Sequence, residues 1–392
     1  MTTRPVVRLK PREGRRLRAG GPWAFSNEIE MSANAKALAP GTVVNVQGDD
    51  GRAFGTGYFN ANSLIALRLL DAQPDVAIDK GFFAQKLKRA RDLRDALYSR
   101  PFYRLVHAEG DYLPGLVIDR FGDTCVVQIT TAGMEAKLDL LLAALDDAVA
   151  PETVILRGDT PSRALEGLPS YVRAAKGDAA RIAVEENAVR YFVDLMGGQK
   201  TGWYYDQRDN RAFMASLARD RSVLDAYCHS GGFALAAAKE GAREVIGLDS
   251  SAPALALAEE SASANGVSAA FVKVDAFEEM ERLGTAGETF DIVIADPPPF
   301  VKSRKDLEPG AKAYRKLARL SAKLVAPNGF LFLASCSHNI APDRFAQECA
   351  MGIQRAGRRA RLIHQSGAGA DHPVHPMLPE SAYLKALVFA LD

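Results

Sequence analysis

The chain has 392 residues, of which 47% are hydrophobic and 25% charged, so composition excludes disorder, collagen and coiled coils and leaves room for two or three domains. No apolar run approaches the roughly 18 residues of a membrane span, and the charged N-terminus lacks the apolar segment of a secretory signal. The four scattered cysteines form no CxxC pair, which argues against a disulfide framework or zinc ribbon and favours a reducing, cytoplasmic location.

The net charge of +1 hides two basic segments. The segment from Thr2 to Trp23 has seven basic residues and one acidic residue, and the segment from Lys80 to Arg104 has eight basic residues and two acidic ones. Clustered positive charge attracts polyanions even when the whole molecule is nearly neutral, so these segments favour RNA or DNA as a partner. The alternative is a solvated helix face and a solvated terminus. The candidate nucleic-acid contacts are Arg12, Arg15, Arg16, Arg18, Lys88 and Arg91.

The first part of the chain reads as a compact β module over residues 1–72, with short alternating strands between Gly, Asp and Asn turns. A boundary at 72–75 precedes a small α+β region that extends to residue 190. Its expected helices are 81–98 and 135–148, and its expected strands are 105–110, 113–121, 123–131 and 153–159.

From Ser222 onward, apolar strands and helices alternate regularly, which predicts an α/β domain built on a doubly wound, mostly parallel sheet within residues 191–392. A last apolar run at 383–391 could add an antiparallel strand at one edge. Ligands of such sheets bind at the carboxyl ends of the strands. The expected strands are 222–228, 244–249, 269–276, 290–298 and 330–336, and the helices are 233–242, 252–265, 278–283 and 312–326.

The first of these strands ends in Asp225 and leads into Ser230, Gly231 and Gly232. Glycines at this point let a backbone approach a ligand closely as the next helix begins. The GxGxxG fingerprint is absent, which weakens a nicotinamide interpretation. An acidic residue here suits a cationic ligand instead, and S-adenosylmethionine (SAM) carries both an ammonium and a sulfonium group.

The next strand ends carry acids as well. Asp249 lies 17 residues after Gly232, where a carboxylate can accept both hydroxyls of a ribose, and Asp275 beside Ala276 could bind the amino group of adenine. Each acid alone could be a helix cap, and Asp249 with Ser250 before a helix fits capping well. Acids on four successive strand ends, Asp296 included, favour SAM binding over four independent caps.

Asp296 begins the segment Asp-Pro-Pro-Pro-Phe, whose rigid backbone presents carbonyls and a carboxylate to a planar nitrogenous group; the alternative is a rigid turn. The fifth strand ends at Cys336, a candidate nucleophile facing the same crevice. Addition of a thiolate to carbon 6 of cytosine activates carbon 5 for methylation. Cys228, Cys125 and Cys349 are expected to be buried packing residues.

The segments SCSHN, DPPPF, DAYCHSGGF, GGQKTGWYYDQRDNR and DHPVHPMLPESAYLK together resemble the bacterial 23S rRNA cytosine-C5 methyltransferase family that carries an N-terminal PUA domain. The resemblance spans nearly the whole chain. It implies a PUA domain at 1–72, a middle domain at 73–190 and, at 191–392, a class I methyltransferase domain with a Rossmann-like, mostly parallel seven-stranded sheet.

The same resemblance implies that Cys336 is the nucleophile and that Asp296 orients the cytosine. It also implies that two segments before the first strand cover the methionine end of SAM or support its loop: Gln199, Lys200, Thr201 and Gly202, and Asp206, Gln207 and Arg208. Many RNA cytosine-C5 methyltransferases have a second cysteine after Asp-x-Pro, where this chain has Pro299, so the group that removes the carbon-5 proton stays open.

The resemblance implies 23S rRNA as the partner, free or in a precursor particle, with no membrane partner. His372 and His375 could suggest a metal pair, but Pro373 prevents a helical presentation and no third ligand is evident, so no metal is expected. Two alternatives stay open: N-methylation of a purine in rRNA, which needs no cysteine, and a non-catalytic RNA-binding assembly factor with a vestigial cofactor pocket. Sequence does not define the modified nucleotide or the oligomeric state.

Overall fold

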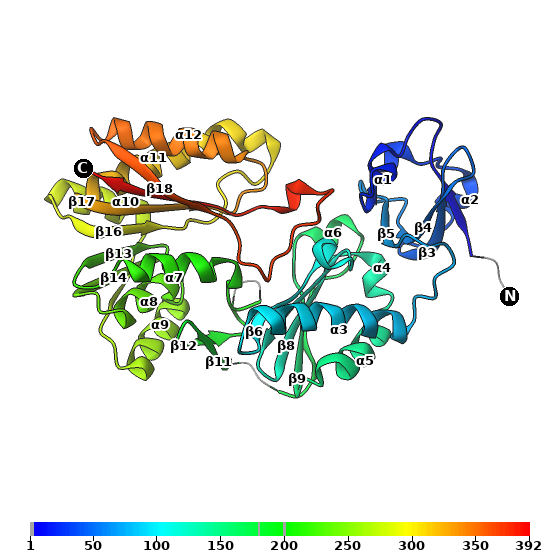
Figure 1. Ribbon diagram of the computed structural model, residues 1–392, viewed down its shortest axis with the longest axis horizontal. Coiled ribbons are helices and arrows are strands. Elements are labelled where there is room, and N and C mark those ends of the chain that lie inside the picture. The colour runs from blue at the N-terminus through cyan, green and yellow to red at the C-terminus, as the bar shows by residue number, and fades with distance from the viewer. Residues whose placement is uncertain (1–3, 179–180, 199–200) are drawn as a thin grey trace. The chain divides into compact units, whose positions relative to one another are not determined.

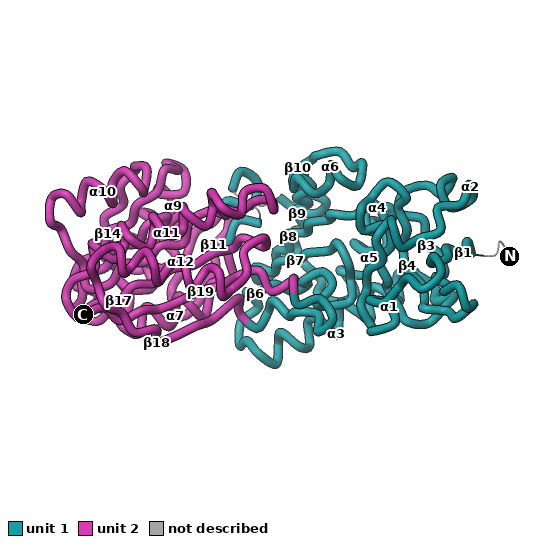
Figure 2. Tube along the Cα trace, turned by 90° about the horizontal axis from the view of Figure 1, so that it is seen from above, with its two compact units in different colours: residues 1–180, 194–203, 370–379 teal, residues 181–193, 204–369, 380–392 magenta. Residues whose placement is uncertain are grey.

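The computed structural model describes residues 4–178, 181–198 and 201–392. The chain forms two compact units, coloured separately in Figure 2. Within the described ranges no helix is long and apolar enough to cross a membrane. The first unit comprises Met1–Ala180, Asp194–Trp203 and Ala370–Pro379, and the second comprises Arg181–Val193, Tyr204–Gly369 and Glu380–Asp392.

The first unit begins with a five-stranded sheet in the order β1-β3-β4-β5-β2, which confirms the predicted β-rich N-terminal module (Figure 1). Alternate side chains of these strands, Val7, Val44 and Val46 among them, form a small apolar core. The strands are β1 (Val6–Arg8), β2 (Trp23–Ala24), β3 (Thr42–Gln47), β4 (Ala53–Phe59) and β5 (Leu67–Asp71), and the short helices are α1 (Arg15–Arg18), η1 (Ser26–Glu28) and α2 (Ala33–Lys36).

A second sheet of this unit has the order β10-β9-β8-β7-β6 and is covered by α3 (Lys80–Leu97) and α5 (Leu138–Val149). Asp79 caps α3 by accepting the N–H of Phe82. The strands are β6 (Phe102–His107), β7 (Leu116–Phe121), β8 (Thr124–Ile129), β9 (Thr153–Gly158) and β10 (Tyr171–Lys176), and the other helices are η2 (Ala108–Asp111), α4 (Ala132–Glu135) and α6 (Ser162–Leu165). The predicted α+β character of the region is confirmed.

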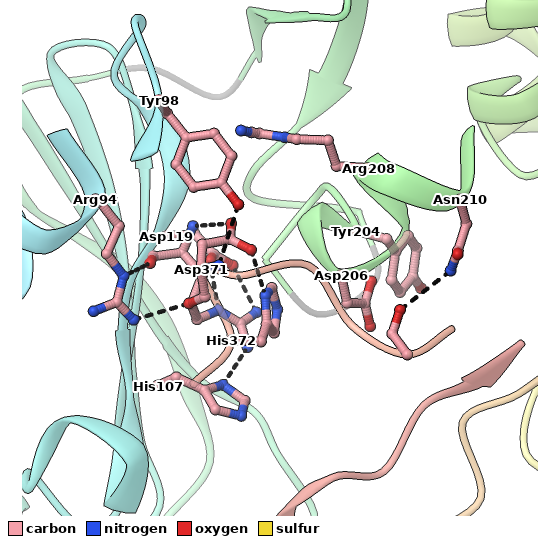
Figure 3. A network of polar contacts seen from close by, with 12 residues as sticks. Arg94, Tyr98, His107, Asp119, Tyr204, Asp206, Arg208, Asn210, Asp371 and His372 are labelled. Carbon is pink, nitrogen blue, oxygen red and sulfur yellow. Dashed lines mark hydrogen bonds and ion pairs between the residues drawn. The ribbon is translucent and has the colours of Figure 1, made fainter. Parts of the chain in front are cut away.

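A buried ionic network lies within the first unit (Figure 3). Arg94 is fully buried and donates to both carboxylate oxygens of Asp111, at 2.5 and 2.8 Å, and to the carbonyl of Asp371. Arg104 pairs with the buried Asp119 at 2.6 and 3.0 Å. Two of the eight cations of the second basic segment are therefore neutralised inside the unit, and the formal charge of that segment overstates its basic surface.

The second unit is built on a seven-stranded sheet in the order β15-β14-β13-β16-β17-β19-β18. The first five strands of this order are mutually parallel, and β19 is antiparallel to both of its neighbours. The strands are β13 (Ser222–Ala226), β14 (Glu244–Asp249), β15 (Ala270–Lys273), β16 (Phe290–Ala295), β17 (Val325–Ser335), β18 (Ala360–Ser366) and β19 (Lys385–Leu391); β11 (Arg181–Glu186) and β12 (Val189–Asp194) pair separately.

Helices cover both faces of this sheet (Figure 1). Successive strand residues alternate between the two faces, so Leu224 and Leu331 pack with α10–α12, whereas Val223 and Phe332 pack with α7 and α8. The predicted doubly wound sheet is confirmed. The helices are η3 (Tyr205–Gln207), α7 (Arg208–Ser216), α8 (Gly232–Lys239), α9 (Ala252–Asn265), α10 (Ala276–Ala286), η4 (Arg304–Asp306), α11 (Leu307–Leu324), α12 (Pro342–Arg355) and η5 (Pro379–Ser381).

Candidate active site

The turn between β13 and α8 lies at the carboxyl edge of the second-unit sheet. Tyr227, His229 and Gly231 all have positive φ angles, at 66°, 51° and 79°. A Cβ on Gly231 would lie 3.1 Å from the Cβ of Ala258, so glycine suits this position for both conformation and space. Ser230 is buried, and Gly232 begins α8. The turn therefore offers a close backbone approach to a ligand at the strand end.

Asp225, at the end of β13, is a buried carboxyl group with half of its hydrogen-bonding capacity unused. Its Oδ2 accepts the N–H of Ala234 at 2.9 Å, while its Oδ1 has no hydrogen-bond partner among the described residues. Burial raises the pKa of Asp225 to about 8, and the nearby carboxylates of Asp296 and Asp249 act in the same direction. Such a group gains a partner when a cation binds beside it.

Asp249 braces the glycine turn from the neighbouring strand. Its Oδ2 accepts the N–H of His229 at 2.9 Å, and its Oδ1 accepts the N–H of Ser251 at 2.8 Å. The side-chain cap of α9 is Ser251, not Asp249 or Ser250, so the simple capping alternative for Asp249 does not hold. Ser250 is exposed.

Asp275 differs from the other two acids, because it does cap a helix. Its Oδ1 accepts the N–H of Glu278 at 3.0 Å as the N-cap of α10, and the residue is exposed, whereas Ala276 is buried. The Tyr227 ring packs edge-on against Phe277, and its hydroxyl has no hydrogen-bond partner in the part of the chain that the structure describes. This corner combines an aromatic surface with polar atoms.

Asp296 follows β16 and is held from a distant part of the chain. Its Oδ2 accepts the side-chain N–H of Gln207 at 2.8 Å, and the amide oxygen of Gln207 accepts from Asn210 at 2.6 Å. The amide oxygen of Asn210 in turn accepts the hydroxyl of Ser366 at 2.5 Å. Both polar atoms of Gln207 are thus used to orient Asp296.

Cys336 follows the last residue of β17 and is half-buried. Hydroxyl groups hold its turn: Ser335 donates to the Tyr314 hydroxyl at 2.8 Å, and the Ser337 hydroxyl lies 2.8 Å from the same oxygen. The Ser337 hydroxyl also accepts the N–H of Val301 at 3.2 Å, which ties this turn to the segment that follows Asp296. The two strand ends are therefore fastened together.

The other three cysteines are buried, as predicted. Burial raises the pKa of Cys125 to about 12, and it raises the pKa values of Cys228 and Cys349 as well. A thiol in such an environment is a poor nucleophile because little thiolate forms near neutral pH. Accessibility thus distinguishes Cys336 from the rest.

Sequence reasoning missed Tyr204, which precedes η3. Burial raises its pKa, with the charges of Asp206, Asp296, Cys336 and Asp249 acting in the same direction. The Tyr204 ring packs edge-on against His229 of the glycine turn, with 5.4 Å between the ring centroids. The backbone of Tyr204 is held by Arg211, which forms a buried bidentate ion pair with Glu186. The polar and aromatic run YYDQRDNR was the available signal.

The remaining candidates lie in the first unit or outside the described residues. Thr201 belongs to the first unit, where it is buried and its hydroxyl donates to the Trp203 carbonyl at 3.4 Å. Gln199 and Lys200 lie outside the described residues.

The candidate nucleic-acid contacts also belong to the first unit. Arg18 pairs with Asp49 and Asp50 at 3.3 and 3.4 Å, and the N–H of Arg12 reaches Asp49. Arg91 pairs with Asp92 and donates to the Ala148 carbonyl. Four of the candidates are exposed on or beside α1, and Lys88 is exposed on α3: Arg12, Arg15, Arg16, Arg18 and Lys88.

The chemistry of this edge fits a cationic nucleoside. The unused oxygen of Asp225 and the raised pKa of that residue suit a positive group, and Asp249 and the Tyr227 corner supply acceptors and an aromatic surface. Within the described ranges, no group of three or more His, Cys, Asp or Glu side chains that could hold a metal ion is assembled.

Comparison with known proteins agrees with this chemistry. Residues 175–390 match the family model of S-adenosylmethionine-dependent methyltransferases, and residues 7–72 match a PUA-like domain. Ribosomal RNA large subunit methyltransferase I from Shewanella denitrificans is 35% identical over 97% of this chain and 98% of its own length. The protein of that name from Tolumonas auensis is 36% identical over 98% of each chain.

Solved structures share the fold across the whole chain. A SAM-dependent methyltransferase from Streptococcus mutans superposes with a TM-score of 0.83 at 21% identity, covering 98% of this chain and all of its own. A methyltransferase solved in complex with SAH gives a TM-score of 0.84 at 21% identity, with 98% and 99% coverage.

Proposed function

The chain belongs to the S-adenosylmethionine-dependent methyltransferase family that includes ribosomal RNA large subunit methyltransferase I, and we propose that it methylates carbon 5 of a cytidine in 23S rRNA. The observation that carries this proposal is Cys336. It is the half-buried cysteine of the four, and it follows β17, the neighbour of β16, which Asp296 follows. A purine N-methyltransferase would not need a nucleophile there.

The cofactor is held, in this proposal, by the ends of β13, β14 and β15. Asp225 faces the cationic methionine end, Asp249 accepts the ribose hydroxyls, and Asp275 with Ala276 contacts adenine. The turn residues Ser230, Gly231 and Gly232, together with Ser250, line the same site. When bound, SAM supplies an electrophilic methyl group.

The reaction on the base belongs to the ends of β16 and β17. The Cys336 thiolate adds to carbon 6 of the cytosine, which turns carbon 5 into a nucleophile able to accept the methyl group. Asp296 binds the ring and amino nitrogens and fixes the base in the plane that this attack needs. After carbon 5 loses its proton, the carbon–sulfur bond breaks and the thiolate leaves. Gln207 supports this step by orienting Asp296 rather than by contacting the cofactor.

The RNA is bound, in this proposal, by the first unit as well as by the active site. The arginines at 12, 15, 16 and 18 contact phosphates, and Lys88 and Arg91 extend the contact along α3. Because Arg18 and Arg91 already have acidic neighbours, we expect these two to contribute less per residue than the exposed Arg15. The target base must leave its stack to reach the thiol. Such a substrate places the protein in the cytoplasm.

Nucleoside analysis tests the proposed product. 23S rRNA from a strain lacking the gene is incubated with purified protein and SAM, digested and examined by mass spectrometry. We expect 5-methylcytidine to appear with wild-type protein and with Cys228→Ala, and not with Cys336→Ala. A methylated purine would overturn the proposed chemistry in favour of nitrogen methylation, and methylation of neither base would favour a non-catalytic assembly factor.

A further inference from the structure

A buried lysine lies opposite the cysteine turn. Lys385 is the first residue of β19, a strand that is otherwise apolar from Ala386 to Leu391, and only 7% of its surface is exposed. Lysine is rarely buried unless a partner compensates its charge. The cost of burying this amine therefore calls for an explanation in the surrounding residues.

The amine is placed beside Cys336 by strand pairing. In the antiparallel register of β17 and β19, Lys385 lies opposite Ser335. Its Nζ donates a hydrogen bond of 2.5 Å to the carbonyl oxygen of Ser337. Lys385 thus contacts the residues on both sides of Cys336: its backbone pairs with Ser335, and its amine binds the carbonyl of Ser337.

Electrostatics agree with this placement. Burial lowers the pKa of Lys385 to about 8, and the Cys336 side chain opposes that decrease, as an adjacent anion does. Below that pH the amine is mostly protonated. Tyr204 and Tyr314 also face Cys336, but burial raises the pKa of each, so both are neutral near pH 7. The other titratable groups near this turn are Asp296, which follows the adjacent strand, and His338, two residues after Cys336, whose ring lies 5.2 Å from that of Tyr383.

We infer that Lys385 is the positioning residue that activates Cys336, by holding its thiolate next to a buried ammonium group. When the S–H bond breaks, the thiol proton passes to solvent, and Lys385 keeps its own three protons. The sulfur then forms its bond to carbon 6, and at the end of the reaction it leaves as a thiolate beside the same ammonium. No net proton transfer to Lys385 is needed. The attack of the thiolate on carbon 6 rests on the proposed function, whereas the inferred ion pair between Lys385 and Cys336 does not.

The test is the pH dependence of Cys336 alkylation in the protein without RNA or SAM. Iodoacetamide is the probe, and mass spectrometry of the Cys336 peptide gives the rate. We expect the wild-type rate to be half-maximal below the pH of about 8.5 typical of an unperturbed thiol. Replacement by Lys385→Met should shift the midpoint upward by at least about one pH unit, which makes alkylation about tenfold slower at pH 7.

Three further variants separate charge from packing. Lys385→Gln keeps a donor for the Ser337 carbonyl without the charge, and should shift the profile as Lys385→Met does, even if the methionine variant folds poorly. Lys385→Arg should restore the wild-type profile. Lys86→Met is the matched control, because burial also lowers the pKa of Lys86, which lies in the first unit over the rings of Phe82 and Tyr112. An unchanged profile in Lys385→Gln would overturn the inference.

Failure of this inference is distinguishable from failure of the proposed function. If the alkylation profile shifts but RNA carrying 5-fluorocytidine forms no adduct with Cys336, the ion pair stands and the carbon-5 mechanism falls. If the adduct forms and the profile of Lys385→Gln matches wild type, the mechanism stands and the role of Lys385 falls.

Discussion

The carboxyl edge of the second-unit sheet has two halves that are built in different ways. On the half proposed to bind the cofactor (the cofactor half), at β13, β14 and β15, the partners are backbone N–H groups of the strand-end turns and helix starts: Ala234 for Asp225, His229 and Ser251 for Asp249, and Glu278 for Asp275. On the base half, at β16 and β17, the partners are remote. Asp296 is held by Gln207, and the Cys336 turn by Lys385 and Tyr314.

We expect this difference to separate the residues that set SAM affinity from those that set the rate of methyl transfer. The cofactor half is built from successive strand–turn–helix units, whose carboxylates accept backbone N–H groups of their own unit or of the adjacent one. The base half requires the completed sheet, because β19 must pair with β17 before Lys385 can reach the cysteine turn. Substitutions in the two halves should therefore have separable effects on SAM affinity and on turnover.

The largest expected effect is on SAM affinity when the buried acid is neutralised. Asp225→Asn should weaken binding by about 100-fold, since a contact to a charged group contributes up to about 3 kcal/mol. In wild type, affinity should increase from pH 6 to pH 8, because cation binding must ionise a carboxyl whose pKa is raised to about 8. Calorimetry at three pH values measures both effects, and the variant reports any pH dependence of the ligand itself.

The same substitution should stabilise the protein without SAM. The folded state keeps the Asp225 proton up to about pH 8, whereas the unfolded state loses it near 3.8, so stability falls as pH rises through that window. Asn has no such proton, and each pKa unit is worth about 1.4 kcal/mol. The Tm advantage of Asp225→Asn should therefore grow between pH 5 and pH 8. An advantage that stays constant with pH would show that Asp225 ionises normally.

A smaller loss of affinity is expected for Asp249→Ala, about 30-fold, or roughly 2 kcal/mol, because both ribose contacts are removed. Asp275→Ser is the matched comparison on the adjacent strand. Serine still caps α10, so stability should be retained while the proposed contact to adenine is lost, with a weakening of about tenfold or less. Calorimetry of the folded variants decides the order, and equal losses would contradict the different roles assigned to the two acids.

The smallest effect is expected on turnover, from a residue that supports the base half without contacting the base. Gln207→Leu removes the hydrogen bond that orients Asp296, so kcat should fall by about tenfold, as expected for one bond to a charged group. SAM affinity should change by less than about twofold. Single-turnover rates and calorimetry measure the two quantities separately. If turnover is unchanged and SAM binds more weakly, Gln207 contributes to cofactor binding and not to the orientation of Asp296.

The two halves also differ in how far sequence could predict them. Asp225, Gly231 and Asp249 lie at the ends of apolar runs. The alternation of apolar strands and helices, and the ends of those strands, were therefore enough to locate them. Cys336 and Asp296 were located in the same way. Their partners were not, because hydrogen bonds between residues 89 positions apart, such as Gln207 and Asp296, follow from the order of strands in the sheet.

Elements without an apolar pattern were missed as well. The edge strand β18 is mostly exposed and carries Arg361 and His364 among its apolar residues, so it shows no clear period. The final strand was expected at an edge, but it lies between β17 and β18. This inserted position is what brings Lys385 beside the cysteine turn. The sequence did not predict the order in which β18 and β19 pair with β17, because that order depends on contacts between residues far apart in the chain.

A covalent trap tests the central claim most directly. A 23S rRNA fragment containing the target cytidine as 5-fluorocytidine is incubated with SAM and protein, and adducts are resolved on a denaturing gel. Fluorine cannot leave carbon 5 as a proton does, so wild type and Cys228→Ala should form a stable protein–RNA adduct whose RNA is linked to Cys336. Cys336→Ala should form none while still binding SAM. An adduct that survives Cys336→Ala, or methylation by that variant, would contradict the mechanism.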